Sequence, residues 1–408
     1  MRLAVVVNRF PSVSETFIFN KVMGLRAAGI DVTVLAHDHT NDLSLFTLPA
    51  PDQPLSFVRY SLTGRGGNRL ALDLSLLGLT NPGGLLSLWK HAQRLYGNST
   101  RALKAWIRAI PLFVGEYDLI HFTYSGLAVS YLDSLPLLAG ARLMTSCRGA
   151  AEQIAPLLKP ERAENLRQVF SRMDLVHCVS MDMLRTAEFY GLSREKAFVN
   201  YPAIDSLVFK RQRPYVAKTE GPYLLLSTGR LHWKKGYEYS LVAVRALLDQ
   251  NYDVSYDIIG AGPEEEKLRF TISDLNLTDH VRLHGRQSAE FIRERLELAD
   301  VFLLPSLSEG LSNAALEAMA MELPVVSTNS GGMAEAIRDN VDGFLVPTRD
   351  PVEIADRIKT LLDNCTLRKE MGESGRRHVE EQFSLSRQIS CFIEKYKALS
   401  TLTSSPRG

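Results

Sequence analysis

The segment that decides the fold runs from Leu303 to Pro324 and reads LLPSLSEGLSNAALEAMAMELP. The apolar run Val301–Leu304 is typical of a buried strand, Pro305 ends it, and a helix follows a short Ser/Gly loop. Ser312 is a favourable N-cap, so the N–H groups after it point out of the helix and offer an anion site. The segment therefore predicts a strand–loop–helix unit that can bind a phosphate.

Two carboxylates flank this anion site. Glu309 lies in the loop, and Glu317 lies about a turn and a half into the helix. Carboxylates bind sugar hydroxyls, so the pocket suits a ligand that is both phosphorylated and polyhydroxylated, such as a nucleotide sugar. The alternative is that both are solvated surface residues, because Glu is common in loops and on helices.

The same strand–helix alternation extends along the whole chain and predicts parallel sheets. The expected strands of the first half are Arg2–Val7, Asp31–His37, Asp118–Thr123, Ala141–Ser146, Leu175–Ser180 and Ala197–Tyr201. Those of the second half are Tyr223–Ser227, Ser255–Gly260, Val281–Gly285, Val301–Pro305, Pro324–Thr328 and Gly343–Pro347.

We predict an α/β protein of two Rossmann-like, doubly wound domains that face a cleft, because 408 residues exceed one ordinary core. The expected division is an N-terminal domain at 1–209, a polar linker at 210–221, a C-terminal domain at 222–382, and a terminal helix and tail at 383–408.

Other loops at expected strand ends also suit phosphate. Arg230 and Lys235 follow one strand, where fixed cations would bind a diphosphate, although a basic surface turn is the alternative reading. Glycines, which would let the backbone approach a phosphate closely, follow three of the expected strands. They are Gly229, Gly260 with Gly262, and Gly331 with Gly332.

The motifs GR…KKG, GxGPE, SxSEGLSNAxLEAMA, PVVST followed by GG, and DGFLVP resemble the nucleotide-binding domain of retaining glycosyltransferases of the GT-B architecture, the glycogen-synthase-like relatives. The resemblance implies that Arg230 and Lys235 bind the donor diphosphate. It also implies that Glu309 contacts the donor sugar and Glu317 holds the ribose hydroxyls. The backbone groups implied to complete the site are those of Gly310, Leu311, Ser312 and Asn313.

The opening NRFPSVSETFIF resembles the FP-x-x-SETF start of glycosyltransferases from bacterial exopolysaccharide clusters, such as those for colanic acid. Ser12 and Glu15 fit a capping box. We expect the helix terminus at Ser14, Glu15 and Thr16 to face the donor, with simple capping as the alternative.

Many relatives carry a histidine in the turn where this chain has Arg148. Arginine cannot be a general base at neutral pH, so Arg148 is expected to contact donor phosphate or sugar, or another group does the work of that histidine. His121, at the end of an expected strand, is the nearest candidate, although a lone histidine is often structural.

The chain contains no DxD motif, so we expect donor binding without a metal and no cofactor beyond the nucleotide-sugar co-substrate. We expect a retaining hexosyltransferase with front-face attack, in which the departing phosphate oxygen takes the acceptor's proton. Two alternatives stay open: a non-catalytic sugar-nucleotide-binding subunit of a membrane assembly, and a sugar-nucleotide epimerase.

The N-terminal half, where we expect the acceptor to bind, carries mainly positive charge. Residues 59–108 hold eight Lys/Arg and one acid, Asp73. A helix with Lys90, Arg94, Arg101, Lys104 and Arg108 on one face and Leu88, Leu95, Leu103, Trp106 and Ile110 opposite would suit an anionic membrane. The alternative is a helix pair with its apolar face in the core, broken at Gly97-Asn98-Ser99.

We therefore expect a saccharide or polyprenyl-diphosphate-linked acceptor and no nucleic acid partner. Four scattered cysteines predict reduced thiols in a cytoplasmic protein. The basic segment 59–108 would allow peripheral contact with the inner face of the cytoplasmic membrane.

Overall fold

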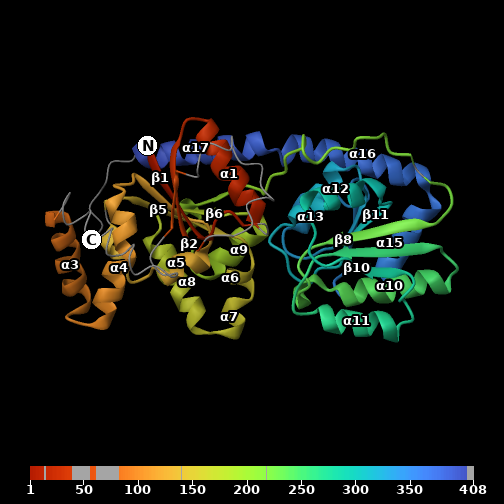
Figure 1. Cartoon of the computed structure of the whole chain (residues 1–408), viewed down its shortest axis with the longest axis horizontal. Helices are drawn as coiled ribbons and strands as arrows, with labels where there is room; N and C mark the ends of the chain where they lie inside the picture. The colour runs from red at the N-terminus through yellow and green to blue at the C-terminus, as the bar shows by residue number, and fades with distance from the viewer. Residues whose placement is uncertain (13–14, 39–55, 61–81, 139, 217, 402–408) are drawn as a thin grey trace. The chain divides into compact units, whose positions relative to one another are not determined.

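The computed structural model describes residues 1–408 except 13–14, 39–55, 61–81, 139, 217 and 402–408. The chain divides into two compact units (Figure 1). The first unit contains residues 1–179, 183–200 and 389–408, and the second contains 180–182 and 201–388. The end of the chain thus returns to the first unit.

The first unit is built on a seven-stranded parallel sheet. Its strands are β1 (Arg2–Arg9), β2 (Asp31–Asp38), β3 (Val58–Tyr60), β4 (Leu119–Phe122), β5 (Arg142–Cys147), β6 (Leu175–Cys178) and β7 (Ala197–Val199). The order is β3-β2-β1-β4-β5-β6-β7, which reverses between β1 and β4. Ligands of such sheets bind where the order reverses, outside the carboxyl ends of the strands.

Helices connect these strands. They are α1 (Thr16–Ala27), α3 (Pro82–Tyr96), α4 (Thr100–Val114), α5 (Ser125–Ser130), α6 (Ala150–Gln153), α7 (Ala155–Leu158), α8 (Glu161–Arg172) and α9 (Met181–Phe189), with short 3-10 turns at Leu135–Leu138 and Arg194–Lys196.

The second unit contains a six-stranded parallel sheet of order β10-β9-β8-β11-β12-β13. The structure confirms the six strands predicted for this half. They are β8 (Tyr223–Thr228), β9 (Val254–Ile259), β10 (Val281–Leu283), β11 (Val301–Leu304), β12 (Val325–Thr328) and β13 (Gly343–Val346).

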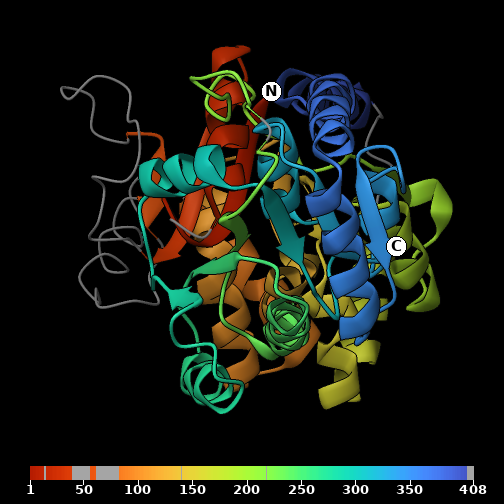
Figure 2. The same cartoon turned by 90° about the vertical axis from the view of Figure 1, so that its right-hand side faces the viewer.

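The helices of the second unit lie on both faces of this sheet (Figures 1 and 2). Two clusters of buried apolar side chains fill the spaces between helices and sheet. The helices are α10 (Tyr237–Asp249), α11 (Glu265–Asp274), α12 (Ala289–Leu298), α13 (Asn313–Ala320), α14 (Met333–Ala336), α15 (Pro351–Asp363) and α16 (Cys365–Gln382), and α17 (Leu385–Thr401) follows. Among the described residues, no helix is both long and apolar enough to cross a bilayer.

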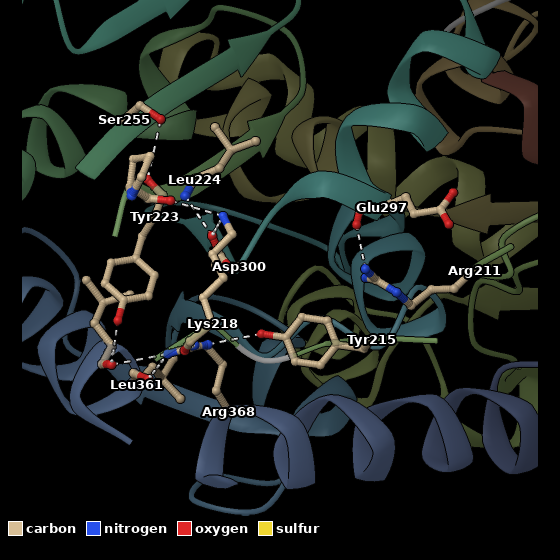
Figure 3. Close-up of polar contacts among 12 residues, drawn as sticks. Arg211, Tyr215, Lys218, Tyr223, Leu224, Ser255, Glu297, Asp300, Leu361 and Arg368 are labelled. Carbon is tan, nitrogen blue, oxygen red and sulfur yellow. Dashed lines mark hydrogen bonds and ion pairs between the residues drawn. The ribbon is translucent and has the colours of Figure 1, made fainter. Parts of the chain in front are cut away.

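The segment predicted as a linker, residues 210–221, packs against the second unit (Figure 3). Arg211 donates to the carbonyl of Met321 at 3.1 Å. Lys218 pairs with Asp300 at 2.8 Å. The wholly buried Arg368 donates to the Tyr215 hydroxyl at 3.0 Å and to the carbonyl of Lys218. These contacts make the segment part of the second unit, because its polar side chains satisfy buried groups there.

Candidate functional site

The loops after β8 and β11 meet where the strand order of the second sheet reverses. The backbone N–H of Leu307 donates to the carbonyl of Lys234 at 2.6 Å. A Cβ at Gly236, whose φ is +60°, would lie 2.3 Å from the carbonyl oxygen of Pro305. The structure therefore brings the loop of Arg230 and Lys235 against the loop of Glu309.

The glycines singled out in the sequence allow backbones to approach closely. A Cβ at Gly260 would lie 1.8 Å from the carbonyl oxygen of Gly229, and one at Gly262 would lie 2.1 Å from that of Leu231. A Cβ at Gly331, where φ is +59°, would lie 1.8 Å from the carbonyl oxygen of Glu309. Any side chain at these positions would push the loops apart.

An ion pair lies at the centre of this arrangement. Lys235 Nζ is 2.5 Å from Glu309 Oε1, and the two side chains are only 13% and 9% exposed. The Ser306 hydroxyl donates to the same carboxylate oxygen at 2.7 Å. Burial alone would raise the pKa of Glu309, but the charge and hydrogen bond of Lys235 outweigh it and lower that pKa. Glu309 is therefore ionised at neutral pH and holds Lys235 in place.

Glu317, unlike Glu309, has no positively charged side chain paired with it in the described part of the chain. Its side chain is half-buried on α13, and among the described residues it forms no hydrogen bond or ion pair. Burial raises the pKa of Glu317 to about 7. A carboxylate in this state gains from any ligand that donates hydrogen bonds to it.

The N-terminus of α13 lies beside these carboxylates. The helix begins at Asn313 with Ser312 as N-cap, as predicted, but the Ser312 side chain makes no capping hydrogen bond. Leu311 and Ser312 are buried, and the carbonyl of Gly310 accepts from the N–H of Gly332 at 3.1 Å. With no side-chain cap, the first N–H groups of the helix stay available to an anion.

Two further cations line the β8 loop. Arg230 is exposed and has no ion pair within the described part of the chain. Lys234, which the sequence analysis did not single out, is half-buried, and burial lowers its pKa against the opposing effect of Glu309. The loop thus presents positive charge beyond what Glu309 neutralises.

Tyr237, at the start of α10, is a residue that sequence reasoning missed. Its hydroxyl is buried without a hydrogen-bond partner in the described structure and would lie 3.0 Å from a Cβ at Gly229. Buried polar atoms usually have partners, so this hydroxyl is a candidate ligand contact. An aromatic residue at a helix start otherwise resembles a core residue, so no sequence signal identified it.

The helix after β12 is only one turn long, because α14 spans Met333–Ala336 and the backbone is extended at Ile337. A single turn has little dipole, so Gly331 and Gly332 act through backbone packing and not through a helix terminus.

In the first unit, the N-terminus of α1 follows β1 at the point where the strand order reverses. The predicted capping box is wrong: the helix begins at Thr16, Glu15 is itself the N-cap, and no side chain caps it. The Glu15 carboxylate instead accepts from the Tyr124 hydroxyl at 2.7 Å. The third residue predicted there, Ser14, lies outside the described residues.

Arg148 lies near the same strand ends. Its Nε donates to the carbonyl of Thr123 at 3.1 Å, and its guanidinium stacks 4.5 Å from the Phe17 ring and 5.9 Å from that of Tyr124. Burial lowers the pKa of Arg148, but arginine keeps its charge. The stacked fork is rigid, and its terminal nitrogens have no partner among the described residues.

His121 lies in a buried hydrogen-bonded chain. His177 Nε2 is 2.7 Å from the carbonyl oxygen of Asn200, which only accepts, so His177 Nε2 carries the proton. His177 Nδ1 then accepts from the Ser146 hydroxyl at 2.9 Å. The Ser146 oxygen accepts from His121 Nε2–H at 2.8 Å. This leaves His121 Nδ1 as the acceptor for Tyr396 at 2.7 Å and Lys21 at 2.9 Å.

The expectation that His121 does the work of a cleft histidine is therefore corrected. Its side chain has no exposed surface, and both ring nitrogens are engaged. Burial, together with the charge of Lys21, holds the pKa of His121 well below its ordinary value. We assign His121 a structural role that depends on Tyr396 of α17, 275 residues away in sequence.

Comparisons with known proteins identify the family. Residues 14–206 match the family model of glycosyltransferase family 4, and residues 208–378 match that of the glycosyl transferases group 1. The amylovoran biosynthesis glycosyltransferase of Erwinia amylovora is 31% identical over 87% of this chain and 89% of its own. A relative from Escherichia coli (strain K12), named provisionally as a colanic acid biosynthesis glycosyltransferase, is 28% identical over 97% of this chain and 100% of its own.

Solved structures show the same fold. Anabaena HepE in complex with UDP-glucose has a TM-score of 0.71 at 18% identity and covers 98% of this chain and 100% of its own. Sucrose-phosphate synthase from Thermosynechococcus elongatus has a TM-score of 0.72 at 18% identity, with coverage of 98% and 99%. The chain therefore has the GT-B fold and belongs to the group 1 glycosyltransferases.

Proposed function

We propose that this glycosyltransferase moves a hexose from a nucleotide-sugar donor to a saccharide or lipid-linked acceptor, with retention of anomeric configuration. The observation that carries the proposal is the joint placement of Lys235, Glu309 and the uncapped N-terminus of α13 at the switch point of the second sheet. Cations and free N–H groups suit a diphosphate, and carboxylates suit sugar hydroxyls. The UDP-glucose complex of a protein with the same fold supports this class of donor.

Each site residue has a distinct proposed role. Arg230 and Lys235 neutralise the charge that develops on the departing diphosphate, the electrostatic effect that is usually largest in catalysis. Glu309 accepts from hydroxyls of the donor sugar while it orients Lys235. Glu317 accepts from the ribose hydroxyls, which explains why its carboxylate has no protein partner among the described residues.

The proposed reaction needs no separate protein base. The acceptor oxygen bonds to the anomeric carbon as the bond between that carbon and the diphosphate oxygen breaks. The acceptor's proton passes to that phosphate oxygen on the same face, so configuration is retained. This route agrees with the engagement of His121 in the buried chain and with the absence of a DxD motif from the sequence.

The names of the relatives guide the proposed pathway. Because two of them are named for amylovoran and colanic acid biosynthesis, we propose that this chain also acts in bacterial exopolysaccharide synthesis. The acceptor in such synthesis would be a saccharide, free or linked to polyprenyl diphosphate.

A donor panel tests the proposal. The full chain is incubated with UDP-, GDP-, ADP- and dTDP-sugars, and release of nucleoside diphosphate is measured with and without a lipid extract that contains polyprenyl-linked saccharides. We expect one donor to release its nucleoside diphosphate only with the extract, and NMR of the product to show the donor's anomeric configuration. Binding without release would instead indicate a non-catalytic subunit, and an epimerised free donor would indicate an epimerase.

A further inference from the structure

Helices α3 and α4 form a hairpin in the first unit and lie side by side (Figure 1). The chain turns at Gly97, whose φ is +63°, and the Ser99 side chain caps α4 by accepting from the N–H of Ala102 at 3.2 Å. The sequence pattern favours one basic amphipathic helix here, with a break at residues 97–99 as the alternative, and the structure contains that break.

An apolar groove opens between the two helices. It has a volume of about 290 Å³. The rings of Trp89 and Trp106 meet edge to face at 5.5 Å, and Trp106 Nε1 donates to the carbonyl of Leu85 at 3.4 Å. The groove is lined by Pro82, Leu85, Leu86, Trp89, Leu103 and Trp106.

The side chains at the mouth of the groove are exposed. Leu86 is 52% exposed and Leu103 is 44% exposed, as is Leu95 in the last turn of α3. In contrast, Leu88 and Ile110 of the same helices are buried in the unit. The hairpin therefore has one apolar side that the unit uses and a second that faces outward, and contiguous exposed apolar surface marks an interaction site.

The charged side chains of the two helices all have one sign. Residues 82–108 contain five Lys/Arg and no acid. Arg101 pairs with Asp133 at 2.6 Å, and Arg108 donates to the carbonyl of Ser130. The other three, Lys90, Arg94 and Lys104, are exposed and have no ion pair with any described residue. Three free cations on the two helices that form an apolar groove complement a surface that is anionic outside and apolar beneath.

We propose that the α3–α4 hairpin docks on the surface of an anionic lipid bilayer. Leu86 and Leu103 enter the boundary between head groups and acyl chains, with Trp89 and Trp106 at the same depth, where indole rings are favoured. Lys90, Arg94 and Lys104 contact the head groups. The inference deepens the proposed function, because docking would hold the enzyme where a lipid-linked acceptor is anchored.

Vesicle flotation tests the docking without donor or acceptor. The probes are vesicles of phosphatidylcholine with about one third phosphatidylglycerol, and pure phosphatidylcholine vesicles as the uncharged comparison. We expect the full chain to float with the anionic vesicles, more strongly at low than at physiological salt, because salt screens the head-group charge.

Two sets of variants separate the contributions of charge and groove. Replacement of Lys90, Arg94 and Lys104 by Gln should weaken binding about a hundredfold, since each cation near such a surface contributes several-fold. Leu86→Ser with Leu103→Ser should weaken it about tenfold through lost apolar burial. The matched control is Leu157→Ser with Leu158→Ser on α7, two leucines that are 78% and 76% exposed in the same unit. This control should bind as the wild type does.

Tryptophan emission supplies a second readout. In a Trp233→Phe background only Trp89 and Trp106 remain, so their emission should shift to the blue with anionic vesicles and be quenched by brominated acyl chains. No flotation of the wild type even at low salt would overturn the proposal. Full binding by the Leu86/Leu103 variant would also overturn it, because adsorption would then be electrostatic only.

The test is independent of the enzymatic proposal. Each variant is checked for its thermal unfolding and for stabilisation by nucleotide sugars, which depends on the second unit. A chain that floats but is stabilised by no nucleotide sugar refutes the proposed function alone. If the exposed leucines instead join two copies of the chain, light scattering will show a dimer that Leu86→Ser dissolves, and this outcome would contradict membrane docking.

Discussion

At the scale of single residues, the two glutamates of the proposed donor site have opposite electrostatic environments. Glu309 is held ionised by Lys235, whereas Glu317 lacks a cation and has a pKa raised to about 7. Sequence spacing predicted both residues but could not distinguish their charge states, because these depend on a lysine 74 residues away and on burial. The difference makes Glu317 the residue whose titration can be observed.

Nucleotide-sugar affinity should depend on pH through Glu317. The ionised carboxylate accepts the ribose hydroxyls, so affinity should fall about tenfold between pH 8 and pH 6 as Glu317 takes up a proton. Calorimetry with the intact nucleotide sugar is the suitable measurement, because its diphosphate does not titrate in this range. Glu317→Gln should bind more weakly and without this pH dependence; the same dependence in that variant would refute the ribose role.

The contribution of Glu317 to the stability of the free protein changes with pH in the opposite direction to its contribution to nucleotide-sugar affinity. Its pKa is raised on folding, so its contribution to stability is complete below the ordinary value of 4.5 and is lost as pH rises through about 7. The bound donor should therefore stabilise the protein most at the upper end of this range.

Arg148 lies in the turn after β5, and its terminal nitrogens have no partner among the described residues. Its guanidinium is stacked on Phe17 and fixed by Thr123, so it presents a rigid fork that a lysine cannot reproduce. We expect Arg148→Ala to lower turnover about a hundredfold and Arg148→Lys about tenfold, measured at saturating donor. Arg172→Ala, an exposed change on α8, is the control. Full activity in both Arg148 variants would show that the turn is only structural.

At the scale of elements, α17 completes the interior of the first unit. Phe392 lies 4.0 Å from Lys21 Nζ, and Tyr396 donates to His121. The sequence pattern predicted the terminal helix but not its partners, since a helix's apolar face does not reveal which sheet it covers. The polar chain under α17 likewise forms only when β4, β5 and β6 are paired.

This buried chain should make the first unit sensitive to acid. Burial lowers the pKa of both His121 and His177 below the ordinary value of 6.5. Their contribution to stability is therefore present above 6.5 and is lost as pH falls below it, because the unfolded state then takes up the protons. We expect the thermal unfolding midpoint to decrease as the pH is lowered from 7 to 5, as measured by near-UV circular dichroism.

A variant separates a structural role of His121 from a catalytic one. His121→Phe leaves Ser146 and Lys21 without their partner, so the free energy of unfolding should fall by about 1–3 kcal/mol. Turnover per folded molecule at a permissive temperature should stay close to wild type. A variant of native stability with turnover abolished would contradict the structural assignment.

At the scale of the whole molecule, the sequence predicted the architecture well and the connections less well. Twelve strands were predicted because buried parallel strands are short apolar runs. The exception, β3, has only three residues, with Arg59 at its centre, and forms through pairing with β2. The segment 210–221 has a polar composition typical of a linker, yet the buried Arg368 joins it to the second unit, and such long-range contacts leave no local pattern.

The candidate site could be located in the sequence because its residues lie in short motifs after strand ends. The unpartnered hydroxyl of Tyr237 could not, because its environment arises from Gly229 and Lys235 folded over it. Motif residues indicate where a donor is expected to bind, and only the fold reveals which buried groups lack partners.

We infer that fixed protein charges stabilise the departing diphosphate in place of a metal ion, namely those of Arg230 and Lys235 together with the α13 terminus. The measurement that tests it most directly is the initial rate of sugar transfer in excess EDTA compared with the rate in magnesium. We predict rates within about twofold of each other, because the electrostatic stabilisation is built into the protein. Loss of transfer in EDTA that magnesium or manganese restores would contradict the account.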